Sequence, residues 1–495
     1  MKKSLSIFVG LVLFLTISYA QGKANKQLQK SLDELLSGQF IENEPGVAVL
    51  IAKSGKVIYE KAYGSANIEL NVPMHPDMVF RIGSITKQFT AIGILQLVEQ
   101  GKIFLQDSLQ KYVKDFPSKG YTITIENLLT HTSGFVDYAS MNDPDPYIER
   151  RDFTGKFIID YFKNEPLKFK PGIKYDYSNS NYALLAYIIE KITGQSYHTY
   201  MEEKVIKRAG LTNTYYANES NVVPKRVTGY TRDRGFYQNS SYQTLSLGFG
   251  CGDLMSTVED LYKWNSALFA YKLVKRETLE KALKPYNLRD GTSSTYGFGW
   301  FIDRKDGRKC IHHEGQVSGF IAMERYYPDE NIYAAILTNV KSGEDTTDFS
   351  DKRFRLFDKV FSLSVGNELP SEIAVNDSIL DSYVGTYRAD SIFKADGTVL
   401  KYTGGEQLIT IRKENKKLFA NLSNGTGKNM YLLPQTETLF FLPDVDRIKT
   451  TIEVIMNNGK PVGLYWTQEN KSEWKKILLR DKRTNAQNWY LQYGG

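Results

Sequence analysis

Ser84 and Lys87 are the pair of residues in this chain whose types and spacing best suit covalent chemistry. Apolar residues recur at every third position from Phe89 to Val98, which predicts an amphipathic helix that ends near Gly101. Because residues three apart share a helix face, the lysine amine is expected beside the serine hydroxyl. A serine hydroxyl becomes a good nucleophile when a base accepts its proton, and a desolvated lysine can be that base. The pattern predicts Ser84 as nucleophile and Lys87 as its proton acceptor.

A second candidate segment is Tyr177-Ser178-Asn179, in a loop just before another helical pattern, where side chains are often presented to a site. A nearby ammonium favours the phenolate of a tyrosine, so Tyr177 is predicted to move a proton. Asn179 is predicted to hydrogen-bond the amide of a substrate. The alternatives are an Asx-type turn with Tyr177 in the core and, for Lys87, a solvated side chain on a capped helix.

The third candidate segment, His313-Glu314-Gly315-Gln316, lies on a predicted strand. Glycine at such a position allows a ligand to approach the backbone, so Gly315 is a predicted substrate-binding position. The backbone N–H groups of Gln316 and Ser84 are predicted to form an oxyanion hole, which needs two donors. His313 is expected near a substrate carboxylate or in the proton relay, and the alternative is an ordinary strand histidine.

Strands and helices that must position these residues occupy the first three quarters of the chain. A hairpin over residues 47–59 precedes Ser84, and helical patterns follow as far as Phe269. A strand meander over residues 300–337 and a helix over residues 354–361 complete this part. Strands at both ends with helices between them predict an α+β fold: an antiparallel sheet flanked by helices, with a helical subdomain.

The composition changes near residue 366, after which short β-rich runs alternate with glycine and asparagine turns. This pattern predicts a small all-β barrel domain with antiparallel strands. The predicted organisation is a signal peptide (1–20), a serine hydrolase domain (25–365), a linker (366–378), the C-terminal β domain (379–482) and a tail (483–495).

Composition and the N-terminal residues restrict the compartment and the partners. A basic start, a short apolar centre and Ser18-Tyr19-Ala20 predict a secretory signal peptide, and hence export to the periplasm or the outside with no integral span after cleavage. A net charge of +7 over 495 residues, without a Lys/Arg block, does not indicate nucleic-acid binding. The five histidines have no metal-ligand spacing, so no metal and no cofactor is predicted. Cys251 and Cys310 form either a disulfide or two buried thiols.

Residues 40 to about 360 resemble the serine β-lactamase and penicillin-binding-protein superfamily, in the branch of class C β-lactamases, DD-carboxypeptidases, D-aminopeptidases and related esterases. The resemblance rests on the three segments in this order and on further phrases typical of the branch: Leu128-Leu129-Thr130-His131-Thr132-Ser133-Gly134, Phe169-x-Pro171-Gly172, Tyr175-x-Tyr177-Ser178-Asn179 and Tyr296-Gly297-Phe298-Gly299-Trp300. The C-terminal part resembles the lipocalin-like β domain that often follows such catalytic domains, through Tyr383-Val384-Gly385-Thr386-Tyr387.

The resemblance implies an acyl-enzyme mechanism on Ser84, with Lys87 accepting or tuning its proton. Tyr177 would pass the proton to the leaving group and activate the deacylating water. Many relatives have Lys-Thr-Gly where this chain has His313-Glu314-Gly315. Histidine is only partly charged at neutral pH, so the hold on a substrate carboxylate is expected to be weaker. Peptidase or esterase chemistry is therefore favoured over efficient β-lactam hydrolysis.

The predicted function is an exported serine hydrolase that acts on D-amino-acid peptides, like DD-carboxypeptidases, D-aminopeptidases or β-lactamases. One alternative is a carboxylesterase of the same family. Another, of a different class, is a penicillin-binding or sensor protein without turnover. The expected partner is a small-molecule or peptide substrate with an amide or ester bond, and the oligomeric state stays open.

Overall fold

Two compact units make up the chain in the computed structural model. The first contains residues up to Asp351 and Leu363–Gly366, and the second contains Lys352–Ser362 and the residues from Asn367 onward. The signal peptide predicted at residues 1–20 and the tail predicted at residues 483–495 lie outside the described residues, and the domain boundaries stay predictions. The structure describes residues 24–477 except 142–149, 217–219, 234, 343–346, 368–373, 394–398, 402–407, 415, 423–429, 435, 443–450, 458–459 and 468–470.

The first unit is built on a six-stranded antiparallel sheet in the order β10-β11-β12-β13-β1-β2. Its strands are β1 (Val47–Lys53), β2 (Lys56–Tyr63), β10 (Phe301–Lys305), β11 (Arg308–Val317), β12 (Phe320–Tyr327) and β13 (Ile332–Thr338). β1 pairs with β13, with Val47 opposite Thr338, so strands from the two ends of this unit lie side by side. β1 and β13 are buried on both faces except at Lys53, as their nearly continuous apolar sequences require. The predicted hairpin, meander and α+β class are confirmed.

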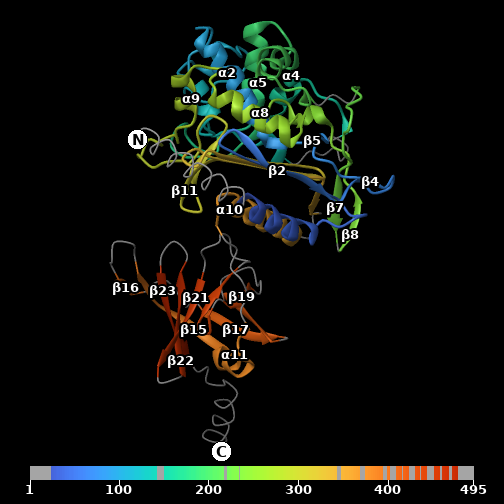
Figure 1. Ribbon diagram of the computed structural model, residues 1–495. Coiled ribbons are helices and arrows are strands. Elements are labelled where there is room, and N and C mark those ends of the chain that lie inside the picture. Colours follow the sequence, from blue (N-terminus) through green and yellow to red (C-terminus); the bar gives the residue numbers. More distant parts are fainter. Residues whose placement is uncertain are drawn as a thin grey trace, which may run out of the picture. The chain divides into compact units, whose positions relative to one another are not determined.

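Helices α2 (Thr86–Glu99), α5 (Asn179–Thr193) and α8 (Val258–Phe269) lie on one side of this sheet (Figure 1). Every residue of α2 from Thr86 to Leu97 is buried, including the polar ones. The prediction of a single apolar stripe is therefore wrong, because α2 is a core helix covered on all sides. The helix ends as predicted, with Gly101 in the left-handed region at a φ of 68°.

Shorter elements connect these parts of the first unit. A helix over residues 24–37 contacts β2, where Asp33 accepts hydrogen bonds from Tyr59, Lys61 and Tyr63. The remaining helices and turns are η1 (Gly83–Ile85), η2 (Leu109–Lys111), α3 (Ile125–Leu129), η3 (Tyr138–Ser140), α4 (Gly155–Phe162), α6 (Tyr197–Met201), η5 (Glu202–Ile206), α7 (Lys207–Ala209), η6 (Leu245–Gly248) and α9 (Arg276–Ala282). The remaining strands are β3 (Ser65–Asn67), β4 (Val72–Pro73), β5 (Phe80–Arg81), β6 (Tyr215–Tyr216), β7 (Tyr230–Asp233), β8 (Phe236–Asn239), β9 (Leu254–Ser256) and β14 (Val340–Ser342).

The second unit is mainly an antiparallel sheet with its own core. Residues of α10 (Thr347–Ser364) are divided between the two units, and α11 (Asp377–Tyr383) precedes the sheet. The strands are β15 (Gly385–Phe393), β16 (Val399–Lys401), β17 (Leu408–Glu414), β18 (Lys417–Leu422), β19 (Met430–Pro434), β20 (Leu439–Phe441), β21 (Thr451–Asn457), β22 (Lys460–Thr467) and β23 (Lys471–Ile477). β15 also pairs with β23, so the last strand returns to the first long one. An antiparallel β sheet is therefore present after α11, whereas a closed all-β barrel is not confirmed and the likeness to lipocalins stays a prediction.

Candidate active site

Ser84 stands in η1, at a tight junction between β5 and α2. Gly83 has a φ of 50°, a left-handed value that glycine adopts without strain. A side chain at Gly83 would place its Cβ 2.8 Å from the backbone nitrogen of Gln316 on β11. A side chain at Gly315 would place its Cβ 1.9 Å from the Ile82 carbonyl oxygen. These two glycines therefore allow the backbone of β11 to approach Ser84 closely.

Lys87 is fully buried, and three atoms fix the position of its amine. Nζ lies 3.1 Å from Ser84 Oγ, 2.8 Å from Asn179 Oδ1 and 2.9 Å from the Cys251 carbonyl oxygen. The Asn179 and Cys251 oxygens can only accept, so each takes one N–H of Lys87. The third direction of the nitrogen faces the Ser84 hydroxyl. In the charged ammonium an N–H points there, and in the neutral amine the lone pair does. Burial lowers the pKa of Lys87, so a larger share of this side chain is in the proton-accepting amine form near neutral pH.

Tyr177 contacts both Lys87 and a buried histidine. The Lys87 Nζ lies 4.8 Å from the centroid of its ring, and the ring of His131 lies 4.3 Å away. The Tyr177 hydroxyl is buried without a hydrogen-bond partner in the described part of the chain. Burial raises the pKa of Tyr177 and outweighs the opposite effect of the neighbouring Ser84. The resting side chain is therefore a neutral phenol, and the expectation that Lys87 favours the phenolate is wrong for this state.

The side-chain amide of Asn179 is engaged at both ends. Its Oδ1 accepts from Lys87 Nζ, and its Nδ2 donates to Asp137 Oδ2 at 3.1 Å. Asn179 also lines the cleft around Ser84. Contact between Asn179 and a substrate amide stays a prediction, and Lys87 is the partner that the resting geometry gives this side chain.

His313 lies on β11 and is buried. Its Nδ1 faces the Glu314 carbonyl oxygen at 2.6 Å and therefore carries the hydrogen, so its Nε2 accepts from the Tyr296 hydroxyl at 3.1 Å. Burial lowers the pKa of His313 to about 3. The partial positive charge expected at neutral pH is therefore absent, because this ring has no access to water.

The cleft next to Ser84 is a cavity of about 200 Å³. It is lined by Arg81, Ser84, Tyr138, Ala139, Asn179, Gln243, Leu247, Gly248, Cys251, Gly252, Gln316, Val317, Ser318 and Lys341. Arg81 and Lys341 bring positive charge to this lining, and none of its residues is an aspartate or a glutamate. The charged side chains that line this cleft are therefore both cations.

Comparison with known proteins places this geometry in a family. Residues 32–356 match the family described as Beta-lactamase. The chain belongs to the Beta-lactamase family. The curated protein "Penicillin-binding protein 4*" of Bacillus subtilis is 27% identical over 441 residues, which cover 85% of this chain and 92% of that protein.

Two solved structures share the fold of this Beta-lactamase family member. The octameric penicillin-binding protein homologue from Pyrococcus abyssi has a TM-score of 0.60 at 24% identity and covers 91% of this chain and 98% of its own. The D-amino acid amidase from Ochrobactrum anthropi has a TM-score of 0.60 at 23% identity and covers 69% of this chain and 98% of its own. Membership of the Beta-lactamase family, rather than these two structures, makes the chain a serine hydrolase of the penicillin-binding-protein-like kind.

Three residues that the sequence analysis did not assign to the site contact it directly. Asp137 accepts a hydrogen bond from Asn179, and the Cys251 carbonyl accepts one from Lys87. The ring of His131 packs against that of Tyr177. His131 belongs to a phrase typical of the Beta-lactamase family, and Asp137 follows it closely, so the phrase itself was the available signal. The role of the Cys251 carbonyl could not be predicted from the sequence, because every residue type has a backbone carbonyl.

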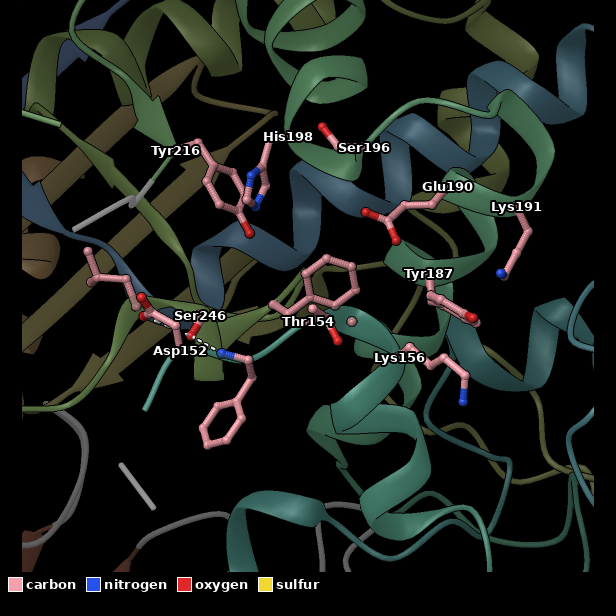
Figure 2. Close-up of a pocket in the computed structure, with 14 residues that line it drawn as sticks. Asp152, Thr154, Lys156, Tyr187, Glu190, Lys191, Ser196, His198, Tyr216 and Ser246 are labelled. Atoms are coloured by element: carbon pink, nitrogen blue, oxygen red, sulfur yellow. Dashed lines mark hydrogen bonds between the residues drawn. The ribbon is translucent and has the colours of Figure 1, made fainter. Parts of the chain in front are cut away.

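A larger cavity, of about 560 Å³, lies elsewhere in the first unit and contains none of the predicted site residues (Figure 2). It is lined by Asp152, Phe153, Thr154, Gly155, Lys156, Tyr187, Glu190, Lys191, Ser196, His198, Tyr216, Leu245, Ser246 and Phe249. Leu245 and Ser246 of η6 line this cavity, whereas Leu247 and Gly248 of the same turn line the Ser84 cleft. Of these two cavities, the smaller is the one in which a serine hydroxyl lies beside a fully buried lysine amine, so it is kept as the candidate active site.

Some further features bear on the remaining expectations. Cys251 and Cys310 are free, buried thiols, so the disulfide alternative is wrong. Within the described ranges, no three His, Cys, Asp or Glu side chains gather closely enough to hold a metal ion. Of the helices that the structure describes, none has the length and apolar character needed to cross a membrane.

Proposed function

We propose that this protein is an exported serine hydrolase that forms an acyl-enzyme on Ser84, with D-amino-acid peptides as its substrates. The observation that carries the proposal is the arrangement of Lys87, whose two carbonyl partners leave its third direction for Ser84. Such an arrangement prepares a base before the substrate arrives, and orientation of this kind contributes several kcal/mol to catalysis, about 7–11 in well-aligned cases.

The proposed reaction has two steps. Ser84 Oγ bonds to the substrate carbonyl carbon and passes its proton to Lys87 Nζ, and the C–N bond then breaks as the leaving amine takes a proton from Tyr177. Water next attacks the ester, gives a proton back through Tyr177 and Lys87, and releases the acid and Ser84. The backbone N–H groups of Ser84 and Gln316 are proposed to hold the developing oxyanion, with Gly315 allowing the close approach of β11.

The charge of the cleft favours a peptide with a free carboxylate over a neutral ester. Arg81 and Lys341 line the cleft, and its lining contains no carboxylate. Because His313 is buried and neutral, these cations are proposed to replace the lysine that many relatives carry at that point of the strand. The names of the similar proteins, a penicillin-binding protein and a D-amino acid amidase, agree with a D-configured substrate.

Intact-mass detection of acyl adducts tests the proposal. The purified chain is incubated with a D-Ala-D-Ala peptide, the same peptide with an amidated C-terminus, a penicillin and short p-nitrophenyl esters, each alongside Ser84→Ala. We expect an adduct on the wild-type chain alone and the fastest turnover with the free-carboxylate peptide. Preferential turnover of the esters would instead favour a carboxylesterase, and a permanent penicillin adduct without turnover would favour a sensor.

A further inference from the structure

Asp137 holds Asn179 by two separate hydrogen bonds. Its Oδ1 accepts from the backbone nitrogen of Asn179 at 3.1 Å, and its Oδ2 accepts from Asn179 Nδ2 at 3.1 Å. Oδ1 also accepts from the backbone nitrogen of Ala139 at 3.2 Å, as a cap of the η3 turn. One carboxylate thus fixes both the main chain and the side chain of the residue that bonds Lys87.

The bond to Nδ2 decides which end of the Asn179 amide faces Lys87. A carboxylate can only accept, so the amide must turn its NH₂ group toward Asp137 and its oxygen toward Lys87 Nζ. With the amide reversed, its NH₂ group would face Lys87, and the amine would have to turn its lone pair there instead of toward Ser84. The orientation of a single amide therefore controls the direction in which Lys87 can accept a proton.

We propose that Asp137 is a positioning residue of the catalytic base: through the Asn179 amide it aims the lone pair of Lys87 at the Ser84 hydroxyl. The inference rests on the proposed role of Lys87 as the proton acceptor. Among the described residues Asp137 makes no hydrogen bond to Lys87 or Ser84. Its charge raises the pKa of Lys87, and it orients the amine through the two hydrogen bonds to Asn179.

Asp137→Asn separates this role from simple capping. Asparagine caps a helix start as well as aspartate does, and its oxygen can still accept from the Ala139 and Asn179 backbone nitrogens. Its NH₂ group, however, opposes that of Asn179 and forces the amide to reverse. We expect acylation of Ser84 to slow by about 10²-fold, the scale of a small misplacement at a reacting centre. The melting temperature is expected to stay close to that of the wild-type chain.

Exchanging the two residues provides the rescue. Asn179→Asp alone puts two carboxylates side by side and is expected to acylate poorly. In D137N/N179D, the NH₂ group of residue 137 again donates to residue 179, whose other oxygen again accepts from Lys87. We expect the double variant to acylate at least tenfold faster than either single variant on its alkaline plateau. A carboxylate now touching Lys87 raises the pKa of the amine, so the acid limb moves to higher pH.

The pH profile is interpretable because the other groups around Lys87 are unchanged in these variants. Those groups are Ser84, His131, Tyr177, Tyr182, Cys251, Asp253 and His313. A residue that only stabilised the fold would change the melting temperature and leave the acid limb in place.

The readout is the second-order rate of labelling by a fluorophosphonate, in which the Ser84 oxygen bonds to phosphorus, fluoride leaves and Lys87 takes the proton. This probe needs no peptide specificity, so it separates the present inference from the choice of substrate. If the wild-type chain is labelled at Ser84, and the effects of the two single substitutions on the labelling rate simply multiply in D137N/N179D, the role of Asp137 alone is overturned. A wild-type chain without labelling at Ser84 would overturn the proposed function and this inference together. Two comparisons each decide the question by themselves: Asp137→Asn against the wild type, and D137N/N179D against Asn179→Asp. One of them is therefore enough if a variant needed for the other fails to fold.

Discussion

The two cavities that meet at η6 contain the same types of polar residue but differ in how those residues are held. Ser84 lines the smaller cleft and contacts Lys87, whose amine lies over the Tyr177 ring, whereas the larger cavity is lined by Ser246, Lys191 and Tyr187. Lys87 is buried and its pKa is lowered, while Lys191 is exposed and contact with Tyr187 raises its pKa. The Ser246 hydroxyl accepts a hydrogen bond from the Phe153 backbone, and its other hydrogen-bond contacts among the described residues are Thr244 and Asp152. Volume therefore does not identify the reactive site, and the desolvation and geometry of its base do.

Loss of the nucleophile gives the largest expected difference between the cavities. Ser84→Ala should lower turnover by at least about 10⁴-fold, because no other group can form the acyl-enzyme. Ser246→Ala, the matched serine of the larger cavity, should leave the rate within about twofold, the change expected when no reacting group is touched. Turnover and fluorophosphonate labelling both report this. Labelling that persists in Ser84→Ala and disappears in Ser246→Ala would reverse the assignment.

Loss of the base should be the next largest effect. Lys87→Ala is expected to slow acylation by about 10²-fold or more, the usual contribution of a general base. Lys191→Ala removes an equal charge from the larger cavity and should have no comparable effect. Stopped-flow acylation rates compare the two variants. Equal rates for them would mean that Lys87 does not accept the serine proton.

Tyr177→Phe removes one hydroxyl and is expected to reduce turnover by about 10²-fold. A phenylalanine cannot give a proton to the leaving group or accept one from the deacylating water, so adducts with slow-leaving substrates should also persist longer. The fold should keep its stability, because the Tyr177 hydroxyl has no hydrogen-bond partner among the described residues. Tyr187→Phe is the matched control. Unchanged adduct lifetimes in Tyr177→Phe would remove the phenol from deacylation.

The pH dependence of acylation sharpens the comparison further. The amine of Lys87 is the active form, so the rate should rise about tenfold per pH unit up to its pKa and then level off. Because burial lowers that pKa, the plateau should begin below 10.5, the ordinary value for lysine. The pKa of His313 is lowered to about 3, so this residue should add no inflection near neutrality. A profile of kcat/KM from pH 4 to 10 tests this, and an inflection lost in His313→Gln would contradict it.

Shortening the chain is expected to have the smallest effect. A chain that ends at Val375 keeps the whole first unit, with its sheet and both cavities, and the α10 residues of the second unit, and it lacks the C-terminal sheet. We expect the shortened chain to unfold in one transition of its own. Its rate of fluorophosphonate labelling should stay within about twofold of that of the full chain. Differential scanning calorimetry and labelling measure this. Loss of folding on truncation would show that the two units form one cooperative structure.

Sequence patterns that depend on neighbouring residues were reliable guides to the fold. The buried strand at 47–51, the meander after Trp300 and the glycine at the end of α2 agree with the structure. The character of α2 was not predictable, because an apolar stripe shows that one face is buried but not that further elements cover the other faces. Likewise, residue spacing could not choose between a disulfide and two thiols for Cys251 and Cys310.

Ionisation states were the weakest predictions about the site. Tyr177 was expected to lose its proton easily beside Lys87, and His313 was expected to be partly charged. Both expectations considered a neighbouring charge or an unperturbed pKa, whereas burial dominates in the structure. Burial is a property of the folded chain, and the residues that exclude water from these two rings are far away in sequence.

By itself the sequence determined the serine and lysine on one helical turn and membership of the Beta-lactamase family. Helical geometry acts over three residues, so spacing alone can bring Ser84 and Lys87 together. Only the tertiary structure decided that Asn179 and the Cys251 carbonyl occupy two directions of the Lys87 amine and that Asp137 orients the amide. Such contacts join residues 92 and 164 positions apart, and packing of the whole unit is what places them in hydrogen-bond range.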